Sequence, residues 1–236
     1  MTARPATIVF DLDGTLADTA RDLIGTLNVI LARENLSPVP FAKARQLIGA
    51  GARTLIQRGF ADDGRELEPN RLERLYGEFL AHYEAHIADE TRLFPGVEEA
   101  LDRFAAAGYA LAVCTNKLER FSRLLLQALG VDRRFHAICG QDTFKIAKPD
   151  RRIFEATVAQ AGGDPGRAIM VGDSATDIAT ARAAGAPVVA VDFGYTDVPI
   201  ESLQPDCVIS HFDDLWDAVG ALRAPAIPAR SAPGAP

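Results

Sequence analysis

The spacing of hydrophobic residues changes along the chain and separates two kinds of organisation. A short apolar run at residues 8–10 is typical of a buried strand, whereas apolar residues from about Thr19 to Ala88 recur at helical spacing, without a strand pattern. After Phe94-Pro95-Gly96, short apolar runs alternate with amphipathic segments as far as residue 222. This alternation is typical of an α/β protein with a doubly wound parallel sheet. We therefore expect such a sheet, with an all-helical insertion between its first and second strands.

The same periodicity assigns the individual elements. Strands are expected at residues 8–10, 109–115, 137–140, 168–172, 187–191 and 207–210. Helices are expected at residues 19–34, 41–48, 53–60 and 69–87 within the insertion, and at 97–107, 119–129, 151–161, 175–184 and 213–222 after it. We expect residues 1–17 and 95–223 to form a Rossmann-like core, residues 18–94 a helical cap domain, and the Pro/Ala-rich residues 224–236 a disordered tail.

The composition is that of a globular protein. With 236 residues and 48% hydrophobic content, the chain can bury a core without covalent staples. It contains neither a signal-peptide pattern nor an apolar run long enough to span a membrane, so we expect a cytoplasmic protein with no membrane partner. Cys114, Cys139 and Cys207 are widely separated and have no partners at metal-ligand spacing, which indicates reduced thiols. A formal net charge of −7 disfavours nucleic acid as a partner.

The first predicted strand leads into two aspartates and a Gly-Thr turn. In an extended strand Asp11 and Asp13 share one face, about 7 Å apart, while Leu12 points to the core. Two carboxylates this close repel each other unless a cation lies between them or one holds a proton, so the pair indicates a divalent metal, acid–base chemistry, or both. The alternative is an Asp-Gly hairpin turn, which needs a second strand after Gly14. Residues 18–31 have helical spacing instead.

Polar residues also lie near the ends of later predicted strands, where ligands of open parallel sheets bind. Thr115-Asn116 follows the second strand, Lys148-Pro149 precedes the helix after the third, and residues 172–177 follow the fourth. Each segment alone has an ordinary explanation: a helix N-cap, a solvated lysine and a strand-to-helix turn. Their joint occurrence indicates a single site at one edge of the sheet.

In order and spacing, these segments resemble the four signatures of the haloacid dehalogenase superfamily. The signatures in this chain are Asp11-Leu12-Asp13-Gly14-Thr15, Thr115-Asn116, Lys148-Pro149 and Gly172-Asp173-Ser174-Ala175-Thr176-Asp177. The resemblance covers residues 6–222 and implies an α/β core with an inserted helical cap. Within the superfamily, residues 47–55, 115–125 and 193–196 are similar to phosphoglycolate phosphatases, although Leu118 and Arg151 depart from their usual pattern. Related sugar-phosphate phosphatases share several of these features.

The resemblance implies a role for each aspartate. Asp11 would attack phosphorus to form an aspartyl-phosphate. Asp13 would protonate the leaving alkoxide and then deprotonate the hydrolytic water. Mg2+ would be bound by Asp11, the main-chain carbonyl of Asp13 and Asp173, with Asp177 completing or orienting its water shell.

The resemblance also implies groups that bind phosphate and a cap that selects the substrate. Thr115 and Lys148 would bind phosphate oxygens, and Asn116 would orient the transferred group. The loop Gly49-Ala50-Gly51, together with Arg53, could bind a carboxylate of the substrate through backbone donors and a positive charge. Alternatively, these glycines only turn the chain between two cap helices.

The function implied is Mg2+-dependent hydrolysis of a small phosphomonoester, with 2-phosphoglycolate as the expected substrate. A phosphatase for another small phosphoester, such as a sugar phosphate, or for pyrophosphate is the alternative, followed by a hexose phosphomutase. A dehalogenase needs neither Asp13 nor the metal, a signalling receiver has no place for a helical cap, and an inactive binding scaffold does not require every motif residue. The expected partner is a small phosphorylated metabolite, and the expected state is a monomer or homodimer.

Overall fold

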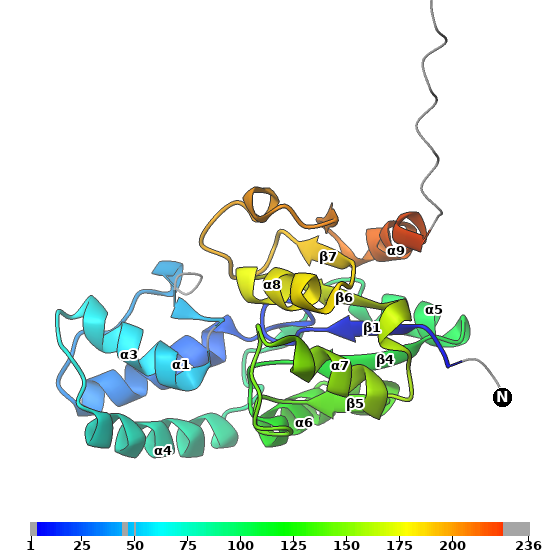
Figure 1. Ribbon diagram of the computed structural model, residues 1–236. Helices are drawn as coiled ribbons and strands as arrows, with labels where there is room; N and C mark the ends of the chain where they lie inside the picture. The colour runs from blue at the N-terminus through cyan, green and yellow to red at the C-terminus, as the bar shows by residue number, and fades with distance from the viewer. Residues whose placement is uncertain (1–3, 44–46, 50, 224–236) are drawn as a thin grey trace, which may run out of the picture.

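The computed structural model describes residues 4–43, 47–49 and 51–223, and a parallel β-sheet lies at its centre (Figure 1). Six strands lie in the order β5-β4-β1-β6-β7-β8, and neighbouring strands are parallel. They are β1 (Thr7–Phe10), β4 (Ala110–Cys114), β5 (Ala137–Cys139), β6 (Ala168–Gly172), β7 (Val188–Val191) and β8 (Cys207–Ile209). The predicted doubly wound sheet is confirmed, with β1 between β4 and β6.

Helices cover both faces of this sheet, which explains why its strands are apolar at consecutive positions. The helices are α5 (Val97–Ala106), α6 (Glu119–Ala128), α7 (Arg151–Gln160), α8 (Ala175–Ala184) and α9 (Leu215–Arg223). Helices α5, α6 and α9 pack on the face that carries Ile8 and Phe10. Helices α7 and α8, in front of the sheet in Figure 1, pack on the face that carries Val9. Each residue of β1 is therefore shielded from water.

Three further helices lie together beside the sheet (Figure 1). They are α1 (Ala20–Arg33), α3 (Ala52–Asp62) and α4 (Pro69–Ala85). Their apolar faces form a cluster of their own, in which Leu27 of α1, Phe60 of α3 and Phe79 of α4 are fully buried or nearly so. Because this cluster is separate from the two clusters on the sheet, we propose that it is the core of a cap domain. Its predicted bounds, residues 18 and 94, stay a prediction.

Two short strands join the helical part to the sheet, and the sequence pattern did not predict them. Strand β2 (Ala17–Asp18) pairs antiparallel with β3 (Arg92–Leu93). Strands of two residues are too short to have a recognisable periodicity. Their pairing brings the two ends of the insertion side by side, so the helical part is connected through a narrow double strand.

The first strand ends before the two aspartates. β1 ends at Phe10, and the backbone turns over residues 12–15, where the N–H groups of Thr15 and Leu16 donate to the carbonyl of Leu12. Gly14 has a φ of 86° in this turn, a conformation that glycine adopts without a steric penalty. The prediction that an extended strand continues through Asp11 and Asp13 is therefore wrong, because the backbone turns there.

Some predictions lie partly or wholly outside the described residues. The helix expected at residues 41–48 begins as a 3-10 turn at Phe41–Lys43, and residues 44–46 are outside the description. The expected disordered tail, residues 224–236, is also outside it. Among the helices that the structure does describe, none is long and apolar enough to cross a membrane.

Candidate active site

The predicted site residues converge beyond the carboxyl ends of the central strands. Asp11 follows β1, Thr115 follows β4 and Asp173 follows β6, so parallel pairing places them at one edge of the sheet. Lys148 comes from the loop between β5 and α7, and its Nζ lies 2.9 Å from Oδ1 of Asp11. Thr115, Lys148 and Asp173 are buried. The structure thus brings together residues that are far apart in the sequence.

Three carboxylates form the centre of this cluster. Oxygens of Asp11, Asp173 and Asp177 all lie within 4.8 Å of one another. Burial, reinforced by Asp177 and Asp11, raises the pKa of Asp173 to about 8. Burial also raises the pKa of Asp11 to about 6, although Lys148 acts in the opposite direction. Carboxyl groups this close resist losing their protons unless a cation compensates the negative charge. Their oxygens are suitable ligands for a hard divalent cation, so these residues fit Mg2+.

Lys148 balances part of this negative charge. Its Nζ lies 2.6 Å from Oδ1 of Asp177 as well as 2.9 Å from Asp11. Burial alone would lower the pKa of Lys148, but the two carboxylates outweigh burial and hold that pKa above its ordinary value. The ammonium group therefore stays charged at neutral pH and can attract an anionic phosphate.

Asn116 holds the loop that carries Lys148. Its Oδ1 accepts a hydrogen bond from the backbone N–H of Lys148 at 2.8 Å, and its Nδ2 donates to the backbone carbonyl of Lys148 at 3.2 Å. Thr115 accepts a hydrogen bond from the backbone N–H of Lys117 at 3.2 Å. Asn116 therefore fixes the backbone of Lys148 relative to β4 through both its N–H and its carbonyl group.

Asp173 is held by donors from two other loops. The Thr15 hydroxyl donates to Oδ1 and the backbone N–H of Tyr195 donates to Oδ2, each at 2.7 Å. A Cβ at Gly194 would lie 2.1 Å from the Cβ of Asp173, so only glycine permits this approach. Sequence reasoning assigned no role to Thr15 or Tyr195. The glycine between Phe193 and Tyr195 is the signal that could have indicated a close approach.

Asp177 belongs to a capping box at the start of α8. The backbone N–H and the hydroxyl of Ser174 donate to its Oδ2 at 3.1 and 2.6 Å, and the Asp177 N–H donates back to the Ser174 hydroxyl at 3.4 Å. Its Oδ1 faces Lys148. The same carboxylate therefore begins a helix and orients the lysine of the site.

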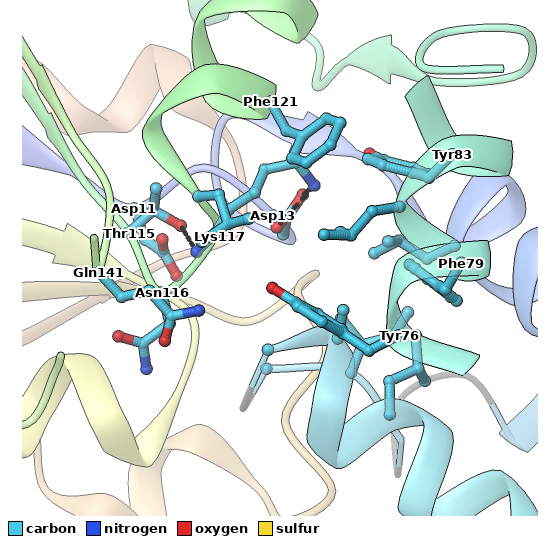
Figure 2. Close-up of a pocket in the computed structure, with 18 residues that line it drawn as sticks. Asp11, Asp13, Tyr76, Phe79, Tyr83, Thr115, Asn116, Lys117, Phe121 and Gln141 are labelled. Atoms are coloured by element: carbon cyan, nitrogen blue, oxygen red, sulfur yellow. Dashed lines mark hydrogen bonds and ion pairs between the residues drawn. The ribbon is translucent and has the colours of Figure 1, made fainter. Parts of the chain in front are cut away.

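Asp13 is separate from these three carboxylates and is paired with Lys117. The Lys117 Nζ lies 3.0 and 3.2 Å from the two carboxylate oxygens of Asp13. The same Nζ lies 4.5 Å from the centroid of the Tyr83 ring on α4. Figure 2 shows these side chains, with Phe121, between the sheet edge and the helical part. The predicted metal ligand at Asp13 is its main-chain carbonyl, and that role stays a prediction.

A pocket lies between the sheet edge and the helical part (Figure 2). Its core side is formed by Asp11, Asp13, Thr115, Asn116, Lys117, Leu118, Phe121 and Gln141. Its other side is formed by Leu23, Ile48, Gly49, Gly51, Ala52, Leu55, Tyr76, Phe79, Leu80 and Tyr83. The ionisable groups for chemistry thus lie on the core side, and the helical part contributes a mostly apolar wall.

Arg53 is not among the described residues that line this pocket. Its Nε and one terminal nitrogen each lie 2.8 Å from a carboxylate oxygen of Glu73. Its guanidinium carbon lies 3.6 Å from the centroid of the Tyr76 ring, and 45% of its side chain is exposed. Gly49 and Gly51 do line the pocket, whereas Ala50 lies outside the described residues. The predicted carboxylate-binding role of Arg53 stays a prediction.

Comparison with known proteins agrees with this geometry. Residues 8–191 match the family described as haloacid dehalogenase-like hydrolase. The chain belongs to this family. A phosphoglycolate phosphatase from Mesorhizobium japonicum is 54% identical over 88% of this chain and 92% of the relative. One from Caulobacter vibrioides is 50% identical over 89% of each chain. The crystal structure of a predicted phosphoglycolate phosphatase from Haemophilus somnus is similar, with a TM-score of 0.85, 32% identity, and coverage of 92% of this chain and 99% of that chain.

This haloacid dehalogenase-like hydrolase is accordingly a phosphatase, similar to phosphoglycolate phosphatases. The resemblance inferred from the four signatures is confirmed. Sequence reasoning did not predict the pairing of Lys117 with Asp13, because a single lysine near a helix start is ordinarily solvated. Its position directly after Thr115-Asn116, at the end of a central strand, is the signal that could have identified it.

Proposed function

We propose that this phosphatase is Mg2+-dependent, acts through an aspartyl-phosphate, and converts 2-phosphoglycolate to glycolate and phosphate. The observation that carries the proposal is that the two aspartates at the start of the chain pair with different lysines. Asp11 lies beside Lys148 within the acidic cluster, and Asp13 lies beside Lys117 at the pocket. One carboxylate is thereby available for phosphorus and another for the leaving group.

The metal would be held by Asp11 and Asp173, with the main-chain carbonyl of Asp13 and the carboxylate of Asp177 completing the site. The fit rests on the three buried carboxylates and on the raised pKa values of Asp11 and Asp173. A bound Mg2+ would offset the negative charges of the nucleophile and the phosphate, which otherwise repel each other.

The chain's own residues supply the remaining chemistry. A carboxylate oxygen of Asp11 attacks phosphorus while the ester oxygen departs and takes a proton from Asp13. Water then attacks the aspartyl-phosphate, Asp13 takes a proton from that water, and the Asp11 oxygen is released with phosphate as the product. Lys148 and Thr115 bind phosphate oxygens during both displacements, and Asn116 keeps Lys148 in place.

The helical part would act as a cap over this reaction. Its apolar wall, including Leu55 and Phe79, limits the water that can compete with the substrate at the site. The small size of the expected substrate is compatible with a pocket enclosed from both sides. We propose a small phosphorylated metabolite as the partner, the cytoplasm as the location, and a monomer or homodimer as the state.

The substrate proposal is supported by the relatives named phosphoglycolate phosphatase. A screen of phosphate release tests it, with purified protein, Mg2+, 2-phosphoglycolate, several sugar phosphates and pyrophosphate. We expect the highest kcat/KM for 2-phosphoglycolate. A higher value for a sugar phosphate or pyrophosphate contradicts the substrate assignment, and conversion of a hexose phosphate to its isomer without net phosphate release indicates a mutase.

A further inference from the structure

The chemistry of 2-phosphoglycolate restricts where its carboxylate can lie, if the proposed function is correct. In this molecule a single methylene carbon separates the ester oxygen from the carboxyl carbon. Asp13 must reach that ester oxygen in order to protonate it. The substrate carboxylate therefore lies close to Asp13, on the side facing the pocket, and it needs a cation or a strong donor there because burying an unpaired charge is costly.

Lys117 supplies a cation at this position. Among the described residues that line the pocket, Lys117 is the one with a positively charged side chain. That side chain is only 7% exposed, and its Nζ lies 3.0 Å from Asp13. An amine that is paired with a carboxylate at this distance carries a positive charge, so Lys117 can attract a second carboxylate.

Tyr83 supplies an unused donor beside it. Its ring packs between Phe79 and Phe121 and lies under the ammonium group of Lys117. Its hydroxyl is buried beside the ammonium group of Lys117, which can donate to the hydroxyl oxygen but cannot accept its hydrogen, so that hydrogen has no acceptor among the described residues. Burial raises the pKa of Tyr83 to about 12, so the hydroxyl keeps its proton at neutral pH. A buried donor without an acceptor, in the wall of the pocket, is expected to meet a ligand.

We propose that Lys117 and Tyr83 bind the carboxylate of the substrate. Lys117 pairs with Asp13 in the free enzyme and shares its three donor hydrogens between Asp13 and the substrate carboxylate in the complex. The Tyr83 hydroxyl donates to the same carboxylate from the helical part. The substrate thereby links the core to the helical part. An ester without a carboxylate lacks this link.

Kinetics with two esters of the same length test the proposal. Ethyl phosphate has a methyl group where 2-phosphoglycolate has its carboxylate, and both are compared in the unaltered enzyme and in variants. Lys117→Met should lower kcat/KM for 2-phosphoglycolate about 10- to 100-fold more than for ethyl phosphate, which is the effect of losing a charge-assisted hydrogen bond, because any effect through Asp13 is common to both esters. Tyr83→Phe should show the same selectivity with a smaller loss, and Lys117→Arg should recover part of the activity.

Two controls separate binding from catalysis and from folding. Calorimetric titration with each ester, in the Asp11→Asn protein with and without Lys117→Met, measures binding in the absence of proton transfer. An effect of Lys117→Met on Asp13 as an acid therefore does not contribute to the measured affinity. Lys43→Met removes a lysine that pairs with Asp62 and does not line the pocket, and it should leave both substrates unaffected. Circular dichroism checks that each variant is folded, and Tyr83→Phe provides the test if Lys117→Met is not.

The outcomes distinguish this proposal from the proposed function. Equal losses on both esters overturn the carboxylate site and assign Lys117 to the support of Asp13. A preference for 2-phosphoglycolate that survives both variants also overturns it, and a selective loss in Arg53→Met would then assign the carboxylate to Arg53. If the unaltered enzyme does not prefer 2-phosphoglycolate over ethyl phosphate, the substrate assignment itself is refuted. The proposed carboxylate site is then refuted as well.

Discussion

Two lysines give the aspartates at the start of the chain different surroundings. Asp11 lies against Lys148 within the cluster completed by Asp173 and Asp177, whereas Asp13 lies against Lys117 at the pocket. A turn of the backbone after Phe10 produces this separation. Neighbouring carboxylates can thus have different tasks, since the environment of each group sets its proton affinity and its access to the substrate.

The role of Asp11 is tested by the change Asp11→Asn. The amide keeps the shape of the carboxylate but cannot attack phosphorus, so turnover should fall at least about 10³-fold. The fold should persist, because the substitution removes a carboxylate from a crowded acidic cluster. Phosphate release and circular dichroism measure the two effects, and activity within about tenfold of the unaltered enzyme would exclude Asp11 as the nucleophile.

The acidic cluster predicts how the stability of the metal-free protein depends on pH. Burial raises the pKa of Asp173 from 3.8 to about 8 in the folded state, so the folded state binds this proton more tightly than the unfolded chain does. The stability that protonation provides is fully present below the unfolded value and is lost as the pH rises through about 8. With EDTA present, the melting temperature should therefore fall as the pH rises from 3.8 to about 8.

The variant Asp173→Asn provides the comparison for this pH dependence. Its side chain cannot ionise, so its melting temperature should fall less steeply than that of the unaltered protein over the same interval. Adding Mg2+ should also reduce the slope in the unaltered protein, because a bound cation favours the ionised carboxylate. Parallel curves for the two proteins without metal would show that Asp173 ionises normally.

At the scale of elements, the sequence pattern predicts what local periodicity controls. The apolar runs of β1 and β6 could be recognised because helices cover both faces of the sheet, and α1 and α4 because their apolar residues recur at helical spacing. β2 and β3 could not be recognised, because two-residue strands form only when the ends of the insertion meet. Local pattern has no information about such distant pairing.

The capping box of α8 gives a prediction at this scale. Ser174→Ala removes the hydroxyl that donates to Asp177 and accepts from its backbone N–H. The loss should destabilise the protein by about 1 kcal/mol, the usual effect of losing an N-cap side chain. It should also lower kcat, because Asp177 then holds Lys148 less firmly.

Ser202→Ala is the matched control for the capping box. Its hydroxyl donates to the carbonyl of Pro199 in an exposed 3-10 turn away from the site. Urea unfolding midpoints and phosphate release are measured for both variants. Equal effects of the two substitutions would contradict a specific role for Ser174.

At the scale of the whole molecule, the site depends on contacts that join distant segments. The four signatures predicted which core residues meet, because parallel strands bring their carboxyl ends to one edge. The approach of Tyr83 from α4 to Lys117 depends on how the helical part packs against the sheet. No spacing rule along the chain predicts that packing. The apolar wall of the pocket could be recognised only as buried residues of helices.

Removal of the metal should affect the whole molecule as well as the reaction. EDTA should abolish phosphate release and Mg2+ should restore it, whereas Ca2+ should restore little, because its larger and less regular shell positions the nucleophile poorly. Because we expect Mg2+ to bind the folded cluster and not the unfolded chain, at about 100 times its dissociation constant it should stabilise the protein by about 2.7 kcal/mol. In Asp173→Asn, the restoration of activity by Mg2+ and the increase in stability should both largely disappear. Full activity after exhaustive chelation would refute metal dependence, and an equal increase in melting temperature in the variant would place the ion elsewhere.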